Sequence, residues 1–171
     1  AYPLSPFGTV AHVGPMTRTV EDSALMMNAI AKPDARDWTS LPFDGRDYVK
    51  KLGKGVKGLK IAFSPTLGYA EVDPEIARAV KKAVQVLANL GAVVKQVDPG
   101  FADPAPCFRT LWWSGARALL GKLPDEKKAM LDPALADVVT QAMAITPEDY
   151  FEAVRERGVL GSQMRVFMEN Y

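Results

Sequence analysis

The sequence predicts an α/β fold that contains more helix than strand. Two short apolar segments, residues 59–64 and 92–97, stand on either side of one strongly amphipathic segment. The order strand, helix, strand is typical of two parallel strands joined by a crossover helix, because parallel strands need a long connection. From Pro106 onward the apolar residues recur only at helical spacing. We therefore expect a parallel βαβ unit with several flanking helices.

A proline-rich lead-in precedes the first predicted helix. Residues 1–15 contain three prolines and two glycines, and proline fixes φ and lacks a backbone donor, so this segment is expected to be extended. Thr19, followed three residues later by Asp22, predicts an N-cap. Good helix formers continue from there to Ala31, and Pro33 ends the helix.

The clearest helix signal lies between the two predicted strands. After a turn-rich, lysine-containing connection over residues 34–58 and the first strand, Asp73 and Pro74 predict an N-cap and a first turn. Gly91 predicts the C-terminal cap. Between them the apolar residues form one stripe, which consists of Ile76, Val80, Ala83, Val84, Leu87 and Leu90.

Three helical stretches are expected after Pro106. Residues 108–119 and 135–142 each present one apolar face. Thr146, followed by a proline, then predicts the start of a long helix, whose apolar residues recur up to Tyr171. Since no stop signal follows, we expect this helix to reach the end of the chain. We also expect the C-terminal boundary of the chain to lie inside a larger protein.

Composition excludes several classes of protein. The 21 basic and 20 acidic side chains leave a net charge of +1, which provides no broad positive field, so we expect no nucleic-acid partner. No apolar run approaches the ~20 residues that span a bilayer, so we expect no membrane association. The single cysteine fits a reducing compartment, and we expect a cytoplasmic location.

No residue pattern in the chain predicts a catalytic, cofactor or metal site. The glycines of residues 53–58 fit G-x-G-x-x-G, but they precede a strand rather than open a helix, which favours a flexible loop over a nucleotide site. His12 is the only histidine, and neither Cys107 nor any serine stands in a nucleophile motif. We therefore expect no catalytic residue, no metal and no cofactor.

Two side chains remain as candidates for substrate contact. Trp112 and Trp113 are adjacent on a predicted helix and so point to different faces, which means that one can pack in the core while the other borders a cleft. The acidic pairs 21/22, 125/126 and 148/149 are interpreted as helix caps or first-turn charges, because neighbours in sequence do not face each other on a helix.

Several blocks resemble the amidase-signature family, in the family's order. The first is Val13-Gly14-Pro15-Met16-Thr17-Arg18-Thr19-Val20-Glu21-Asp22, which is similar to the segment that follows the family's catalytic residues. Residues 34–42 resemble its "D-rD-tS-p" turn. Residues 58–64, 72–75 and 90–92 resemble its "GLkIg…vdPei…LGa" unit.

The resemblance implies an α/β/α fold around a large mixed sheet and hydrolysis of amide bonds by a Ser–Ser–Lys triad. This chain contains no Gly-Gly-Ser-Ser or similar loop, so no catalytic residue is carried over. Gly14, Pro15, Arg18 and Asp22 match the family motif, and we expect them to shape the turn and anchor the following helix. Residues 1–171 are interpreted as one partial domain, truncated at both ends and inactive alone.

Two alternatives stay open. The parent can belong to the amidotransferase A-subunit branch, which releases ammonia from glutamine for tRNA-dependent amidation, although residues 108–120 do not resemble that branch. The chain can also be a non-catalytic helical interaction module, because the apolar residues of its last helix would be exposed by truncation. We expect a small-molecule amide as substrate of the full-length protein, and a homodimer or truncation-induced self-association.

Overall fold

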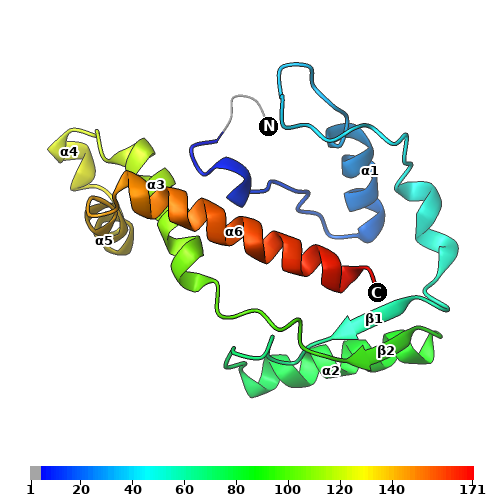
Figure 1. Ribbon diagram of the computed structural model, residues 1–171. Coiled ribbons are helices and arrows are strands. Elements are labelled where there is room, and N and C mark those ends of the chain that lie inside the picture. The colour runs from blue at the N-terminus through cyan, green and yellow to red at the C-terminus, as the bar shows by residue number, and fades with distance from the viewer. Residues whose placement is uncertain (1–4) are drawn as a thin grey trace. The chain divides into compact units, whose positions relative to one another are not determined.

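Helices dominate the computed structural model, which describes residues 5–171. The first four residues of the predicted lead-in lie outside the described residues. With η for a 3-10 helix, the elements in chain order are η1 (Gly8–Val10), α1 (Val20–Ile30), η2 (Val49–Lys54), β1 (Lys60–Phe63), α2 (Pro74–Asn89), β2 (Val93–Gln96), α3 (Ala105–Leu120), α4 (Asp125–Lys128), α5 (Pro133–Ala142) and α6 (Pro147–Met168) (Figure 1). The predicted α/β class with more helix than strand is confirmed.

The chain forms two compact units, and each combines two stretches that are distant in sequence. Unit 1 contains the described residues up to Lys54 together with Thr110–Thr146. Unit 2 contains Gly55–Arg109 and Pro147–Tyr171. The interpretation of residues 1–171 as one partial domain stays a prediction.

The predicted βαβ arrangement forms the sheet of unit 2. The strands β1 and β2 pair in parallel, with Lys60 opposite Val93 and Phe63 opposite Gln96, and α2 packs against β2 (Figure 1). Each strand is shorter by one residue at both ends than the apolar segment that predicts it.

The caps of α2 are the ones that the sequence predicts. The Asp73 carboxylate accepts hydrogen bonds from the backbone N–H groups of Glu75 (2.7 Å) and Ile76 (3.4 Å). At the other end, Gly91 has a φ of 95°, a left-handed conformation that favours glycine. Its carbonyl accepts a hydrogen bond of 2.8 Å from the N–H of Gly58, which leads into β1.

The sequence reasoning missed the N-cap of one helix of unit 1 and the existence of another. The Asp132 carboxylate accepts hydrogen bonds from the N–H groups of Ala134 and Leu135, with Pro133 in the first turn of α5. This is the same arrangement as at Asp73. The short helix α4 was not predicted, although Asp125 and Glu126 lie in its first turn, as the interpretation of that acidic pair requires.

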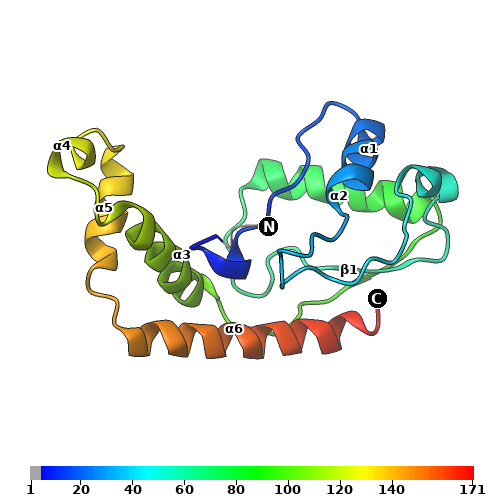
Figure 2. The same cartoon turned by 90° about the horizontal axis from the view of Figure 1, so that it is seen from above.

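The last helix, α6, is one unbroken helix from Pro147 to Met168 (Figure 2). The expectation that it continues through Tyr171 is wrong. The N–H groups of Glu169, Asn170 and Tyr171 each bond to a carbonyl three residues earlier instead of four, so the chain leaves the α-helical path in a tighter final turn.

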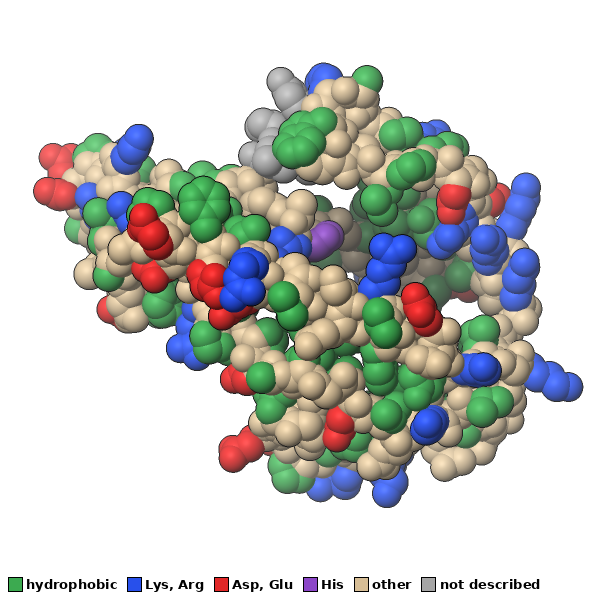
Figure 3. Space-filling model, in the orientation of Figure 1, with side chains coloured by type: hydrophobic (Ala, Val, Ile, Leu, Met, Phe, Trp, Pro, Cys, Tyr) green, Lys and Arg blue, Asp and Glu red, His purple; other side chains and the backbone are tan. Residues whose placement is uncertain are grey.

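The buried core of the described residues is small. The buried apolar residues are Ala24, Ala92, Leu111, Ala116, Val139, Ala142 and Ala153. Many larger apolar side chains are exposed, including Met16 (95%) and Leu41 (84%), and hydrophobic side chains interrupt the polar surface in Figure 3. Among residues 5–171, none of the helices has the length and apolar character needed to cross a membrane.

Candidate functional site

The segment that carries the family motif runs without regular structure into the capped start of α1. Its hydrogen bonds come from hydroxyl groups. Thr17 Oγ1 donates to the carbonyl of Thr19 (2.8 Å) and shares a 2.6 Å hydrogen bond with Ser23 Oγ. Thr19 Oγ1 accepts from the N–H of Asp22 (3.1 Å), which is the predicted N-cap. The hydroxyls of Thr17 and Ser23, which the sequence reasoning did not single out, therefore join the end of the motif to the helix.

The four motif residues named as structural lie at or near the surface. Gly14, Arg18 and Asp22 are exposed, and Pro15 is half-buried. Among residues 5–171, no ion pair involves Arg18. The roles predicted for these four residues in turn shape and helix anchoring stay predictions.

The turn that resembles the family's "D-rD-tS-p" segment is held by local hydrogen bonds. The Asp34 carboxylate accepts from both Nε (2.9 Å) and Nη2 (2.6 Å) of Arg36, and this guanidinium holds the pKa of Asp34 below its ordinary value. Asp37 Oδ1 accepts from the N–H (3.0 Å) and the hydroxyl (2.6 Å) of Thr39. The acidic residues of this turn thus shape the backbone.

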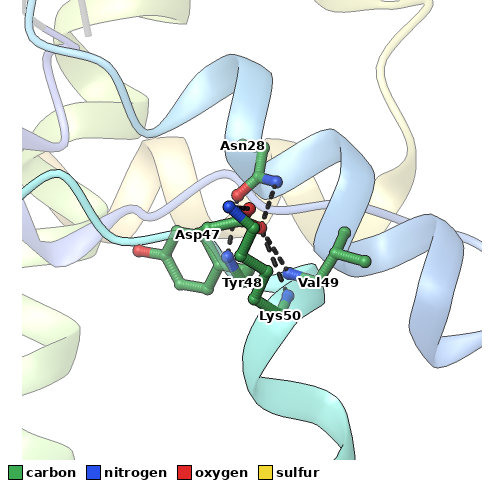
Figure 4. A network of polar contacts seen from close by, with 5 residues as sticks. All are labelled: Asn28, Asp47, Tyr48, Val49 and Lys50. Carbon is green, nitrogen blue, oxygen red and sulfur yellow. Dashed lines mark hydrogen bonds and ion pairs between the residues drawn. The ribbon is translucent and has the colours of Figure 1, made fainter.

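A polar network connects α1 to η2 within unit 1 (Figure 4). Asn28 Nδ2 donates to Asp47 Oδ1 (3.0 Å), and Asn28 Oδ1 accepts from the N–H of Tyr48 (2.9 Å). The same Asp47 oxygen accepts from the N–H groups of Val49 (3.1 Å) and Lys50 (3.3 Å). The hydrogen bond from Asn28, followed by that from the Lys50 N–H, lowers the pKa of Asp47.

Ser64 and Asp98 follow the two strands of unit 2 and meet at their carboxyl ends. Ser64 Oγ donates to Asp98 Oδ1 (2.6 Å) and accepts from the N–H of Leu67 (2.8 Å). Leu67 has a φ of 56°, in the left-handed region that non-glycine residues seldom adopt. The hydroxyl joins two loops, and among the described residues it has no hydrogen bond to a lysine or a histidine.

The two candidate tryptophans differ in their surroundings. The ring of Trp112 stacks on Phe7, with centroids 4.5 Å apart and planes inclined by 30°. Both tryptophans are half-buried. Because its ring stacks on Phe7, we interpret Trp112 as a packing residue of unit 1. Trp113 is then the stronger candidate for substrate contact. Both assignments stay predictions.

His12 and Cys107 differ in their surroundings. His12 is exposed. The thiol of Cys107 donates to the carbonyl of Ala153 (3.2 Å), and burial, together with the negative charge of Glu156, raises its pKa. Because the thiolate is the nucleophilic form, a raised pKa makes this thiol less nucleophilic at neutral pH than an ordinary cysteine. No cluster of three or more His, Cys, Asp or Glu side chains within residues 5–171 could hold a metal ion.

The glycine-rich stretch of residues 53–58 lies in the context that the sequence indicates. It begins inside η2, and Gly55 and Gly58 have φ values of 67° and 81°. The strand β1 follows directly, and no helix begins there. In nucleotide-binding folds such glycines open a helix whose N-terminus faces the phosphate, and this stretch lacks that helix.

A groove of about 570 Å³ opens on unit 2. Lys60 and Lys95 project from its two strands, and Phe167 and Tyr171 border it from the end of the chain. Its lining contains no serine, cysteine or histidine. The groove lining therefore lacks the serine hydroxyl or cysteine thiol that usually forms an acyl-enzyme.

Comparisons with known proteins agree on one family. A family model described as Amidase matches residues 4–164. An acylamidase of Rhodococcus erythropolis is 31% identical over 163 residues, which are 94% of this chain and 34% of that protein. The glutamyl-tRNA(Gln) amidotransferase of Staphylococcus saprophyticus has an A subunit that is 33% identical over 166 residues, which are 93% of this chain and 34% of that protein.

The fold is also similar to a solved structure. The crystal structure of a bacterial aryl acylamidase of the amidase-signature family superposes with a TM-score of 0.81 and 27% identity, covering 92% of this chain and 34% of that one. The chain therefore spans about a third of the length of the relatives that it matches.

Proposed function

This chain belongs to the amidase family, and on that premise we propose that it is the part of an amidase that lies downstream of the catalytic residues. The whole enzyme would hydrolyse carbon–nitrogen bonds of small amides to a carboxylate and ammonia or an amine. A Ser–Ser–Lys triad outside this chain would carry out the chemistry, and the chain itself would be inactive. The observation that carries this proposal is a family match over residues 4–164 of a sequence that contains no Gly-Gly-Ser-Ser or similar loop.

The hydroxyl partners in the structure support an inactive scaffold. Among the described residues no hydrogen bond joins a serine hydroxyl to a lysine, and Ser64 and Ser114 bond to a carboxylate and a backbone carbonyl. A nucleophilic serine needs a neighbouring base, and in the proposed triad that base is a lysine. The exposed apolar side chains support the same proposal, since further polypeptide of an amidase would cover them.

The test is an assay of the isolated chain with acetamide and with 4-nitroacetanilide. We expect release of ammonia and of 4-nitroaniline no faster than in buffer. Release that is lost in Ser64→Ala but retained in Ser162→Ala, an exposed serine on α6, would overturn the proposal. A circular-dichroism spectrum of each variant shows that a loss of activity is not a loss of fold.

A second candidate is the A subunit of an amidotransferase that acts on glutamyl-tRNA(Gln). It is favoured by the similarity to the Staphylococcus protein, which extends over as much of this chain as the acylamidase match does. The fold similarity to an aryl acylamidase favours the simple amidase. In an enzyme that carries this chain with its upstream part, anilide hydrolysis without partner proteins supports the amidase, and glutamine hydrolysis that requires them supports the alternative.

A further inference from the structure

The described N-terminal end of the chain forms a short strap whose one aromatic side chain reaches α3. The strap, defined as Ser5–Val10, is closed by its own hydrogen bonds: the N–H of Gly8 to the carbonyl of Ser5 (2.8 Å), and the N–H of Val10 to the carbonyl of Phe7 (3.2 Å). Ser5 Oγ also accepts from the N–H of Phe7 (3.2 Å). These local hydrogen bonds hold the backbone around Phe7 in a turn, independently of the contacts that its ring makes.

The surface of α3 has a notch where this ring lies. Gly115 is buried, and a Cβ atom added to it would lie 2.9 Å from Cε1 and 3.0 Å from Cγ of Phe7, and closer still to Cδ1. The ring also stacks on Trp112, one turn earlier on α3. Glycine inside a helix is less favourable than alanine, so the missing side chain destabilises α3 and the contact with Phe7 offsets that loss.

The segment between the strap and α1 has no regular structure of its own. Residues 11–17 lie in neither helix nor strand, and Val13 and Met16 are 92% and 95% exposed. Hydrogen bonds and a ring contact hold the chain on either side of this segment. At one end stands the hydroxyl network of Thr17 and Ser23, and at the other end stands the strap with Phe7.

We propose that Phe7 is a positioning residue, whose ring in the Gly115 notch joins the two stretches of unit 1 and holds the motif-bearing segment 11–17 in place. The contact spans both stretches, because Phe7 belongs to the first and α3 from Thr110 onward belongs to the second. Removal of the ring frees one end of the segment while α1 and its cap stay intact. This proposal does not depend on the proposed amidase function.

The first test is a mutant cycle in the isolated chain. We expect Gly115→Ala to lower the thermal unfolding temperature, whereas Gly158→Ala, a glycine in α6 with open space around it, raises or preserves it. In a Phe7→Ala background, Gly115→Ala should no longer be destabilising, because the clashing ring is gone. If Gly115→Ala behaves like Gly158→Ala in the unsubstituted chain, the notch does not exist and the proposal fails.

The second test measures the motion of the segment directly by ¹⁵N relaxation. In the unsubstituted chain we expect backbone order parameters of about 0.8 at Val13, Gly14 and Met16, falling below about 0.6 in Phe7→Ala, while Leu25 in α1 keeps its value. If Phe7→Ala fails to fold, Phe7→Leu serves as the milder variant. We expect its order parameters at Val13, Gly14 and Met16 to lie below those of the unsubstituted chain. The proposal fails if the order parameters of Val13, Gly14 and Met16 are already low in the unsubstituted chain. It also fails if Phe7→Ala lowers the order parameter of Leu25 as much as theirs.

Discussion

Asn28 and Asp47 bond to each other across the turn-rich segment that separates α1 from η2. Asn28 uses both ends of its amide: Nδ2 donates to the Asp47 carboxylate at 3.0 Å, and Oδ1 accepts from the N–H of Tyr48 at 2.9 Å. Asn28 therefore holds both the Asp47 carboxylate, which accepts from the first N–H groups of η2, and the backbone of Tyr48, which leads into η2. Residues 31–46, which contain the family-like turn, are bounded by this contact.

Asn28→Ala should loosen this connection without unfolding the chain. The substitution leaves the half-buried N–H of Tyr48 without its side-chain acceptor, and the loss of such a hydrogen bond costs about 1 kcal/mol in the free energy of unfolding. Urea denaturation followed by circular dichroism measures the change. Gln85→Ala removes an exposed side-chain bond to Asn89 on α2 and should change stability by less than about 0.5 kcal/mol. Equal effects of the two substitutions would contradict the prediction.

The contribution of Asp47 should depend on pH in the acidic range. Its pKa is lower in the folded chain than the ~3.9 of an unfolded aspartate. The ionised carboxylate therefore stabilises the fold fully above that value, and this stabilisation is lost as the pH falls through the lowered folded pKa. We expect the stability difference between the unsubstituted chain and Asp47→Asn to be constant near neutral pH and to shrink on acidification. A stability difference that grows toward low pH would mean that the pKa of Asp47 is raised in the folded chain, which would contradict the prediction.

Arg117 should be a stabilising residue of the helical part of unit 1. Its Nη1 donates to the carbonyl of Ala142, the last residue of α5, and to that of Ile145 in the turn that follows, both at 3.2 Å, where carbonyls lack an N–H partner four residues further on. Arg117→Met keeps the apolar stem but removes the charge, and should lower the free energy of unfolding by about 2 kcal/mol. Arg109→Met, on the same helix but at an exposed position, serves as the matched control and should be nearly neutral.

The features predicted correctly from the sequence are those that depend on neighbouring residues. Thr19 and Asp73 cap their helices because a side-chain oxygen reaches an N–H two or three residues further on, whatever the rest of the fold does. Gly91 takes a left-handed φ for an equally local reason. The parallel strand pair was predictable because the crossover helix between the strands leaves few other arrangements.

The contacts that hold each unit together could not be predicted in this way. No local pattern distinguishes Gly115 from the other glycines of the chain, because its role appears only when Phe7 is brought against it. The same is true of Ser64 and Asp98, which lie far apart in sequence and meet because their strands pair in parallel. The asparagine–aspartate contact between α1 and η2 likewise needs the fold before it can be recognised.

Trp112 and Trp113 should respond differently to truncation. Trp112→Ala removes the stack on Phe7, and since a fully buried aromatic residue costs about 3–5 kcal/mol on truncation, a half-buried one should cost about 2 kcal/mol. Trp113→Ala should change stability less. In an active amidase that carries this chain, Trp113→Ala should shift the preference between aliphatic and aromatic amides. An unchanged preference in both variants would remove the tryptophans from the substrate site.

The isolated chain should associate with itself. Among its exposed large apolar side chains are Val13 at 92%, Trp38 at 83% and Leu41 at 84%, and burying apolar surface is favourable by about 25 cal/mol per Å². Light scattering after size exclusion should therefore give a mass that rises with concentration. Trp38→Ser combined with Leu41→Ser should lower that mass, whereas Lys81→Ser and Lys82→Ser on the exposed face of α2 should not. A constant monomer mass over the accessible concentration range would show that the exposed apolar side chains form no self-complementary surface.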